Sequence, residues 1–349
     1  LERNTDLRVA AANLQRTRAL LSEARAGQLP STTLNAQYVR QRFGGQVFNS
    51  IGNVPVVTTD FFTTGIDASY EIDLFGGVNR AVRAAVADAQ AAQAQVDAAR
   101  VAVAAETAQT YAQGCALAAR VRAAEESAAL ARRSLALIET TKRAGAADAR
   151  DVAAARTVLA QAEAALPQLV AERRAALYAL AFLTGDAPED VSEDAAACAA
   201  VPDLAAPLPV GDGQALLARR PDIRVAERQL ARDTERVGVA VAALYPQIRL
   251  LGTPSLGAAQ LGDLGSAASF GFSVGPLISW NFPFNGAARA QVRAAKADTE
   301  ASLARFDAAV LGALQETEQA LARLSGALAA EARLREAADA ARETARLTE

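Results

Sequence analysis

The stretch "SYEIDLFGGVNRAVRAA" (residues 69–85) begins with the alternation of a β-strand and ends with the spacing of an α-helix. When it is extended back to Phe62, the even positions are mainly apolar and the odd positions include three carboxylates. Successive side chains of a strand point to opposite faces, so this strand is predicted to have one apolar and one polar face. The helix that follows across Gly76 and Gly77 is rich in alanine. The sequence therefore predicts a two-faced strand that leads directly into a long helix.

The chain also contains an internal repeat. "TDLRVAAANL" (5–14) matches "PDIRVAERQL" (221–230) at an offset of 216 residues, and "RAAVAD" (83–88) matches "RAAKAD" (293–298) at an offset of 210. The two offsets differ by six residues, so the segment between the matches is shorter in the second copy, as expected of a surface loop that varies in length. Chance alignment of alanine-rich helices is the alternative, but charged residues and prolines match in the same order. The repeat indicates a duplicated structural unit.

Each copy is predicted to consist of a helix, a strand, a loop, a strand and a long helix. The first structural repeat covers residues 1–184, a linker rich in Pro, Gly and Asp covers 185–213, and the second repeat covers 214–349. In the first repeat we expect strands at about 31–43 and 60–74, a long helix at 78–142 and a return helix at 148–184. In the second we expect strands at about 247–257 and 268–282 and a long helix at 286–349.

The second strand of each copy is longer than the ~5–6 residues of an ordinary strand. Its length suits a tilted strand that crosses a membrane, which needs ~9–11 residues. A soluble antiparallel sheet with one face on a layer of helices would bury the same even positions and is the alternative. The strands are few and long for the amount of helix, and Pro276 within a strand needs an edge or an irregular position. We therefore expect the strands to cross a membrane.

In lipid every backbone polar group must be paired, so a membrane-spanning sheet has to close on itself. Four strands from one chain cannot close, because single-chain barrels start at about eight strands. A barrel of eight strands, from two chains, would be filled by its own side chains, whereas a barrel built from three or more chains would leave a lumen. Lumen-facing positions are predicted at Asp67, Glu71, Asp73, Ser273 and Asn281, and lipid-facing positions at Phe62, Ile66, Tyr70, Phe270, Phe272 and Trp280.

The first long helix contains no proline from about Val78 to Thr141, and only Gly114 interrupts it. It would extend roughly 90–95 Å. Such a length is typical of a coiled-coil or tubular assembly rather than of a globular core. A free-standing coiled-coil rod is the alternative, but it leaves the alternating strands unexplained. Strands and helices together suggest a conduit.

The composition argues against other classes of function. A formal net charge of −3 offers no basic surface for nucleic acid. The chain has no His and only two Cys, so the commonest general base and metal ligand is missing and no metal site is expected. It also lacks a Gly-rich phosphate-binding loop. We expect neither an enzyme nor a cofactor. An enzyme built on Glu71 and Asp73 is the least favoured alternative, since no base or metal accompanies them.

Four segments carry a resemblance to a known family. "RRPDIRVAERQLARDTERVGVAVAALYPQIRL" (219–250) and the stretch 69–85 resemble signature segments of outer-membrane factors, the TolC-like channel proteins of Gram-negative efflux systems. "LTGDAPED" (183–190) and "APLPVGDGQALLARRPDIR" (206–224) are similar to the NodT/OprM-type lipoprotein branch. The resemblance implies a mainly α protein with β: a homotrimer whose twelve-stranded outer-membrane β-barrel, four strands per chain, continues into a long periplasmic α-helical barrel.

This resemblance implies a passive export duct of a tripartite efflux pump. The implied partners are outer-membrane lipid, a periplasmic adaptor (membrane fusion protein) and an inner-membrane transporter, expected to be of the RND type. The implied location is the outer membrane, with the helical part in the periplasm and a lipid anchor in the full-length protein. A periplasmic adaptor and a soluble structural coiled-coil protein are the alternative functions. An adaptor has a single helical hairpin, whereas this chain duplicates a helix-strand-strand-helix unit.

The resemblance also implies roles for particular residues. The turn between the long helix and the return helix corresponds to the adaptor-docking tip, carried here by Arg143, Gly145, Asp148 and Asp151. An ordinary capped turn with solvated charges is the alternative. In an oxidising periplasm the two cysteines, Cys115 and Cys198, are expected to form a disulfide, with two buried free thiols as the alternative. The second tip with its gating residues, and a lipidated cysteine, are expected outside the printed sequence.

Overall fold

The computed structural model describes residues 3–43, 57–202, 212–282 and 284–348. Packing divides the chain into two compact units, which we call the hairpin unit (residues 1–15 and 92–221) and the sheet unit (residues 16–91 and 222–349). These units differ from the two sequence repeats, because α1 (Thr5–Ala26) and α2 (Gly77–Arg143) contribute residues to both. The division of the chain into repeats therefore stays a prediction.

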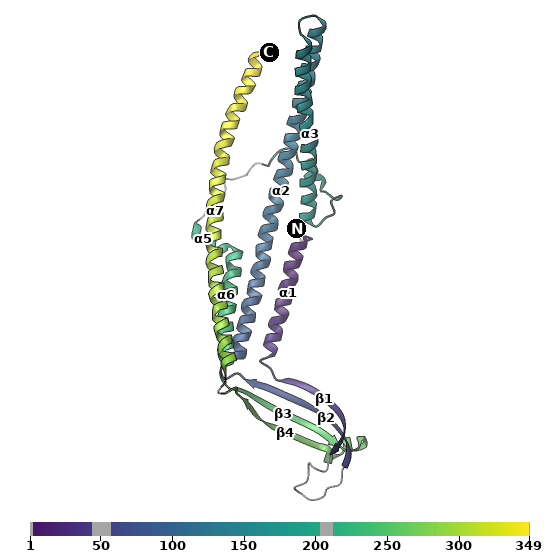
Figure 1. Cartoon of the computed structure of the whole chain (residues 1–349), viewed down its shortest axis with the longest axis vertical. Helices are drawn as coiled ribbons and strands as arrows, with labels where there is room; N and C mark the ends of the chain where they lie inside the picture. The colour runs from purple at the N-terminus through teal and green to yellow at the C-terminus, as the bar shows by residue number, and fades with distance from the viewer. Residues whose placement is uncertain (1–2, 44–56, 203–211, 283, 349) are drawn as a thin grey trace. The chain divides into compact units, whose positions relative to one another are not determined.

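The sheet unit contains one antiparallel sheet in the strand order β1-β2-β3-β4 (Figure 1). Its strands are β1 (Ser31–Phe43), β2 (Val57–Ile72), β3 (Gln247–Ala258) and β4 (Phe270–Ser279). The short 3-10 helices η2 (Leu261–Gly265) and η3 (Ala267–Ser269) lie between β3 and β4. Pairing of β2 with β3 joins strands that are far apart in the sequence. Within the described residues β1 and β4 are paired on one side only, so the sheet has two open edges.

The register brings the even-numbered residues of all four strands to one face, which we call the apolar face. Tyr38 lies opposite Phe62, and Ile248 lies between Ile72 and Ile278. The odd-numbered residues form the opposite, polar face. A slip of one residue in any pairing would exchange the faces of a strand, so the continuity of the apolar face fixes the register.

Two prolines lie within strands of this sheet. Pro276 is in β4, an edge strand, which is where sheets tolerate proline. Pro254 is in the central strand β3, and the ladder between β2 and β3 is interrupted opposite it, at Ile66 and Asp67. Proline has no N–H to donate, which accounts for the interruption.

The turn between β2 and α2 is built by a glycine and a carboxylate. Gly76 has a φ of +75°, a left-handed conformation that glycine adopts without strain. The carboxylate of Asp73 accepts hydrogen bonds from the backbone N–H groups of Val78 (3.0 Å) and Asn79 (2.8 Å) at the positive end of the helix. The assignment of Asp73 to the strand is therefore wrong. The alternation of residue types continues past the last paired residue, but the carboxylate caps α2.

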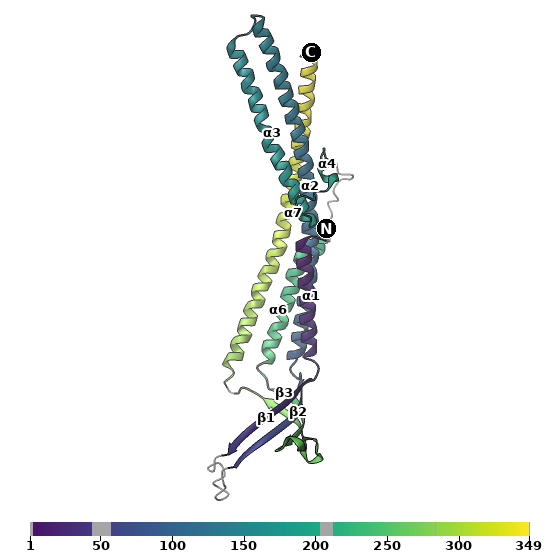
Figure 2. The same ribbon diagram turned by 90° about the vertical axis from the view of Figure 1, so that its right-hand side faces the viewer.

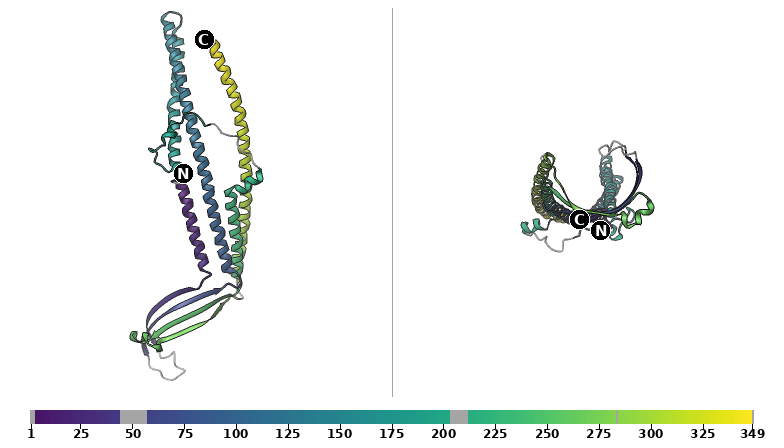
Figure 3. Two further views of the ribbon diagram at one scale, coloured as in Figure 1. Left: turned by 180° about the vertical axis from the view of Figure 1, so that it is seen from behind. Right: turned by 90° about the horizontal axis from the view of Figure 1, so that it is seen from below.

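Helices α6 (Pro221–Ala242) and α7 (Gly286–Thr348), the first turns of α2 and residues 16–26 of α1 complete the sheet unit (Figure 2). The side chain of Arg80 on α2 lies across Gly238 on α6, in the space that a Cβ at this position would occupy. A Cβ on Gly77 would come within 3.2 Å of the Cβ of Ala242. Small residues thus allow α2 and α6 to approach closely. The connections between strands and helices gather at one end of the sheet (Figure 3).

In the hairpin unit, α2 and α3 (Ala149–Thr184) form an antiparallel helical hairpin (Figure 2). The short helices α4 (Glu193–Ala197) and α5 (Gly213–Arg219) follow in the sequence. The apolar core of this unit is built from few and small side chains, with Leu14 of α1 packed on Ala92 and Val96 of α2. The fully buried Asn4 donates a 2.9 Å hydrogen bond to the carbonyl of Leu183 at the end of α3. No helix in the described part of the chain has the length and apolar character that a membrane span requires.

Candidate functional site

The apolar face of the sheet presents the side chains that the sequence assigned to lipid. Ile66, Tyr70, Phe270 and Phe272 are exposed. Phe62 is half-buried, and its ring lies 4.8 Å from that of Tyr38 between centroids. A contiguous exposed apolar surface of this extent marks an interface with a membrane or with another protein. These five residues share one face, and their contact with lipid stays a prediction.

On the polar face the predicted carboxylates have partners on neighbouring strands. Asn35 of β1 donates a hydrogen bond to Asp67, and the guanidinium of Arg249 on β3 lies 3.7 Å from the carboxylate of Glu71. These partners could not be predicted from the sequence, because alternation within one strand does not show what lies opposite. Ser273 is exposed on β4. Asp67, Glu71 and Ser273 therefore share one face, as a polar lumen lining requires.

Two further predicted positions lie beyond the sheet. Trp280 and Asn281 follow the last residue of β4, so the expectation that this strand extends to about residue 282 is wrong. The N–H of Phe282 donates to the carbonyl of Trp280 (3.2 Å), and this local turn takes the N–H that strand pairing would need. The indole N–H of Trp280 donates to the carbonyl of Leu244 (3.1 Å), between α6 and β3.

The predicted docking tip is an exposed, strongly capped turn. Gly145 has a φ of +81°, and nothing lies near the position of a Cβ. The carboxylate of Asp148 accepts from the N–H of Asp151 (3.0 Å), whose own carboxylate accepts from the N–H of Asp148 (2.8 Å). This reciprocal pair is a capping box that starts α3. Arg143 donates to the hydroxyl of Thr140 (3.0 Å). All four predicted tip residues thus lie together, and their role in docking stays a prediction.

A disulfide lies in the hairpin unit. Cys115 of α2 is buried and is bonded to Cys198, which follows α4, with 83 residues of sequence separation. Backbone carbonyls on both sides of Cys198 accept hydrogen bonds from Arg122 of α2 and Arg173 of α3. The segment around Cys198 is therefore held to both helices of the hairpin.

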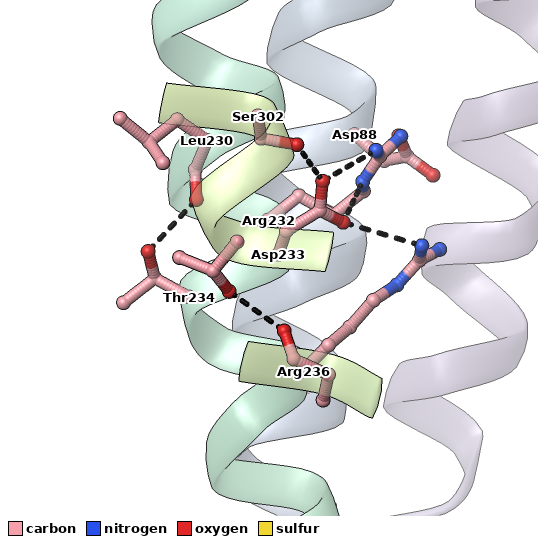
Figure 4. Close-up of polar contacts among 9 residues, drawn as sticks. Asp88, Leu230, Arg232, Asp233, Thr234, Arg236 and Ser302 are labelled. Atoms are coloured by element: carbon pink, nitrogen blue, oxygen red, sulfur yellow. Dashed lines mark hydrogen bonds and ion pairs between the residues drawn. The ribbon is translucent and has the colours of Figure 1, made fainter. Parts of the chain in front are cut away.

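A buried polar cluster connects α2, α6 and α7, and we call it the Asp233 node (Figure 4). Asp233 of α6 is only 4% exposed. Its carboxylate accepts two hydrogen bonds from the guanidinium of Arg232 (2.8 and 2.9 Å) and one from that of Arg236 (3.4 Å). It also accepts one from the hydroxyl of Ser302 on α7 (2.6 Å). Arg232 also donates to Asp88 of α2 (3.1 Å). The node therefore links three helices that are distant in the sequence.

The charge balance of the node follows from these contacts. Burial raises the pKa of Asp233, but hydrogen bonds from Arg232 and Ser302 and the charges of Arg232 and Arg236 outweigh it, and the net pKa lies below its ordinary value of 3.8. The hydrogen bond to Asp233 raises the pKa of Arg232 despite its partial burial. Both partners are thus charged at neutral pH. The node contains no unpaired acid or base that could serve catalysis, and its geometry fits a structural role.

A second charged cluster lies on α2 and α6. Glu235 is 3.4 Å from Arg80 and 3.4 Å from Arg83, and its side chain is partly buried. Asp233 and Glu235 lie in segment 219–250, which carries the family resemblance, but neither residue was predicted to belong to a site. The available signal was the density of alternating charges on one amphipathic helix, which indicates ion pairing without showing the partner.

Comparison with known proteins agrees with the arrangement of strands and helices. The family described as "Outer membrane efflux protein" matches residues 1–186 and 213–349. The outer membrane protein OprJ of Pseudomonas aeruginosa is 29% identical over 327 residues, which cover 92% of this chain and 67% of OprJ. The solvent efflux pump outer membrane protein SrpC of Pseudomonas putida is 30% identical over 326 residues, covering 92% and 67%. The solved structure of the outer-membrane channel OprN has a TM-score of 0.83 at 36% identity, covering 90% of this chain and 69% of OprN.

The fold and these likenesses define the chain as an outer-membrane channel protein that combines a four-stranded sheet with long helices. The chain belongs to the outer membrane efflux protein family. The expectation of an outer-membrane factor is confirmed, and the chain is the outer-membrane component of an efflux pump. The alternatives of a periplasmic adaptor and a soluble coiled-coil protein are not supported.

Proposed function

We propose that three copies of this chain close one twelve-stranded barrel, which serves as the passive exit duct of a tripartite efflux pump. The observation that supports this proposal most directly is the open sheet. Its two edges, β1 and β4, are each paired on one side within the described residues, and its apolar face is exposed. Unpaired strand edges are not viable in lipid, so β1 of one copy would pair with β4 of the next.

The height of the apolar face suits a bilayer. Along β2 it runs from Phe62 to Ile72, which corresponds to roughly 33 Å of strand. Tilted by about 45°, this length gives an apolar band of about 25 Å, the usual height in outer-membrane barrels. Beyond Phe62 the same face becomes polar: Asp60 accepts from the hydroxyl of Tyr38 (3.0 Å) and lies 3.8 Å from Arg40. These polar groups would meet water at the outer surface.

The polar face would line the lumen. Asp67 and Glu71 on β2 and Ser273 on β4 share this face, and the first two have partners on β1 and β3. A barrel of about twelve strands leaves an open interior, whereas about eight strands would be filled by side chains. The duct would have no catalytic role, and the energy for export would come from the partner transporter.

The tip of the α2–α3 hairpin would dock a periplasmic adaptor that connects the duct to an inner-membrane transporter, expected to be of the RND type. Arg143, Gly145, Asp148 and Asp151 are all exposed there. The capping box makes the turn rigid, so its charges would be presented in a fixed arrangement with little ordering cost on binding. The proposed duct thus has a lipid surface, a lumen and a docking end.

The decisive experiment combines the single-channel conductance of the purified protein in planar bilayers with its oligomeric mass in detergent. A trimer that gives discrete conductance steps would establish the duct. A monomer or dimer without bilayer activity would contradict closure of the barrel by three chains, even with the fold intact.

A further inference from the structure

The hairpin of β1 and β2 extends beyond the rest of the sheet. Tyr38, Phe62 and Ala258 form the last paired row that includes β3. Past this row β1 and β2 continue as a pair over residues 39–43 and 57–61, which we call the extension. The connections to the helices are at the opposite end of the sheet (Figure 1). Within the described residues, no third strand pairs with the extension.

Charged side chains replace apolar ones on the even-numbered face of the extension. Arg40 and Arg42 are exposed there, and Asp60 and Thr58 lie opposite them. Arg40 lies 3.8 Å from the carboxylate of Asp60, which also accepts a hydrogen bond from the hydroxyl of Tyr38 (3.0 Å). Arg42 has no acidic partner among the residues that the structure describes. This face, which we call the arginine patch, therefore carries a net positive charge with one unpaired guanidinium.

The positions of the two arginines suit the headgroup layer of a bilayer. Alternate residues of a strand are roughly 6.6 Å apart, which gives roughly 5 Å of height at a tilt of about 45°. Arg40 is thus roughly 5 Å, and Arg42 roughly 10 Å, beyond the last apolar row at Tyr38. The polar layer on each side of the hydrocarbon is roughly 5–8 Å thick. Arg40 lies within this layer, and the long side chain of Arg42 can reach back to it.

We propose that Arg40 and Arg42 bind the phosphate groups of the glycolipid that forms the outer leaflet of a Gram-negative outer membrane. With the helices in the periplasm, the extension lies at the outer leaflet. A guanidinium presents several N–H donors in a plane that matches the oxygens of a phosphate. Asp60 pairs with Arg40 and lowers the local charge, so Arg42 makes the stronger contact. The proposal rests on the proposed function, because it presupposes that the apolar face lies in lipid.

The charge and the surroundings of the arginine patch favour this lipid over other partners. A zwitterionic phospholipid places a cation beside its own phosphate, whereas a lipid with phosphates alone complements two arginines. The apolar face begins directly below the patch at Tyr38 and Phe62, so one molecule with acyl chains and phosphates can contact both. A second copy of the chain would pair with the backbone edge of β1, which leaves the even-numbered face turned outward.

Competition between lipids at a single tryptophan tests this proposal. Trp280 is the only tryptophan of the chain, so Trp280→Phe/Phe62→Trp places the fluorophore in the row directly below the patch. The full-length protein is reconstituted in vesicles of phosphatidylcholine with brominated acyl chains, which quench the tryptophan on contact. Unbrominated lipid A with two phosphates then replaces part of this lipid, and unbrominated phosphatidylcholine gives the baseline. From the recovery of fluorescence, we expect lipid A to be preferred about tenfold.

Substitutions in the arginine patch should change this preference in opposite directions. Arg42→Ala removes the unpaired cation and should lower the preference about fivefold, whereas Arg42→Lys keeps the charge and should lower it less. Asp60→Asn keeps an acceptor for the hydroxyl of Tyr38 but removes the negative charge, so the preference should rise. Damage to the fold would not raise it. Arg333→Ala, at an exposed position of α7, should leave the preference unchanged.

The outcomes separate this proposal from the proposed function. If brominated phosphatidylcholine quenches neither Phe62→Trp nor Ala258→Trp, a second reporter in the same row, the apolar face does not contact lipid and both proposals fail. If it quenches them but lipid A is not preferred, or Arg42→Ala keeps the full preference, the arginine patch is wrong and the barrel stands. An equal preference for phosphatidylglycerol would show general attraction to negative charge and would overturn the assignment to the glycolipid.

Discussion

The hydroxyl of Ser302 on α7 donates a 2.6 Å hydrogen bond to the buried carboxylate of Asp233 on α6. This bond joins two residues that are 69 positions apart in the sequence, and Arg232 extends the contact to Asp88 on α2. Three helices that begin or end at the sheet are therefore held in one relative position by a single carboxylate. The Asp233 node is expected to stabilise the base of the proposed helical barrel.

Replacing the carboxylate tests this expectation. Asp233→Ala leaves Arg232 and Arg236 without their buried acceptor and Ser302 without its partner, so the free energy of unfolding should fall by about 2–4 kcal/mol. Ser302→Ala removes one hydrogen bond and should cost about 1–2 kcal/mol. Denaturant unfolding followed by circular dichroism in detergent measures both.

A matched control for the node is an exposed ion pair on α7, the helix that carries Ser302. Glu336 lies 2.9 Å from Arg333 with both side chains well exposed, so Glu336→Ala should change stability by less than about 0.5 kcal/mol. Equal losses for Asp233→Ala and Glu336→Ala would show that the node contributes nothing beyond a surface pair.

The node also predicts a pH dependence. The folded-state pKa of Asp233 is depressed below 3.8, so its stabilisation is complete above the unfolded value and is lost as pH falls through the folded value. The difference in unfolding free energy between the wild type and Asp233→Asn should stay constant above about pH 5 and shrink towards about pH 3. A difference that grew in acid would mean that burial dominates and that the pKa is raised.

Much of the sheet could be predicted from local alternation, because each strand exposes one face to a consistent environment. The same rule failed at both strand ends. Asp73 fits the odd-position pattern, yet its oxygens serve the first N–H groups of α2. Trp280 and Asn281 fit the pattern of β4, yet a local turn removes them from it. Alternation records residue type, whereas pairing depends on where the backbone N–H groups find acceptors.

The Asp233 node could not be predicted from the sequence for a different reason. Its helix shows many charges, but the choice of Ser302 and Asp88 as partners depends on how α2, α6 and α7 pack. The disulfide partners were predictable because the chain has only two cysteines. Two cysteines allow only one pairing, so no knowledge of the packing is needed to predict it. The partners of one carboxylate among 39 acidic residues cannot be predicted without that knowledge.

Loss of the disulfide should loosen the hairpin unit. The Cys115→Ala/Cys198→Ala double variant removes a crosslink over 83 residues. In the chain-entropy model such a crosslink stabilises the folded state by up to about 4–5 kcal/mol. We expect faster proteolysis near Cys198, because only the hydrogen bonds from Arg122 and Arg173 would then hold this segment to the hairpin. Dithiothreitol should reproduce this effect in the wild type and have none on the double variant. Reaction of the unreduced wild type with a thiol reagent would show that the bond is absent.

The docking role of the tip can be separated from its capping role. Asp148→Ser keeps a side-chain acceptor at the start of α3, whereas Asp148→Ala should cost about 1 kcal/mol of helix stability. Arg143→Ala leaves the capping box intact. If the tip docks an adaptor, Arg143→Ala should lower adaptor copurification several-fold without loss of helicity. Arg133→Ala, at an exposed position of α2 that precedes the tip, should leave copurification unchanged. Equal copurification by all variants would leave only the capping role.

The close approach of Arg80 to Gly238 predicts a non-additive pair of substitutions. A side chain at position 238 must displace the Arg80 side chain, which would break the 3.4 Å contact between Arg80 and Glu235. Gly238→Val should therefore cost about 1–3 kcal/mol, while Gly238→Ala should cost less, because Arg80 is flexible and alanine favours helix. In an Arg80→Ala background the cost of Gly238→Val should fall by more than about 0.5 kcal/mol, the coupling expected of residues in contact. Equal costs in both backgrounds would show that α2 and α6 do not meet at this point.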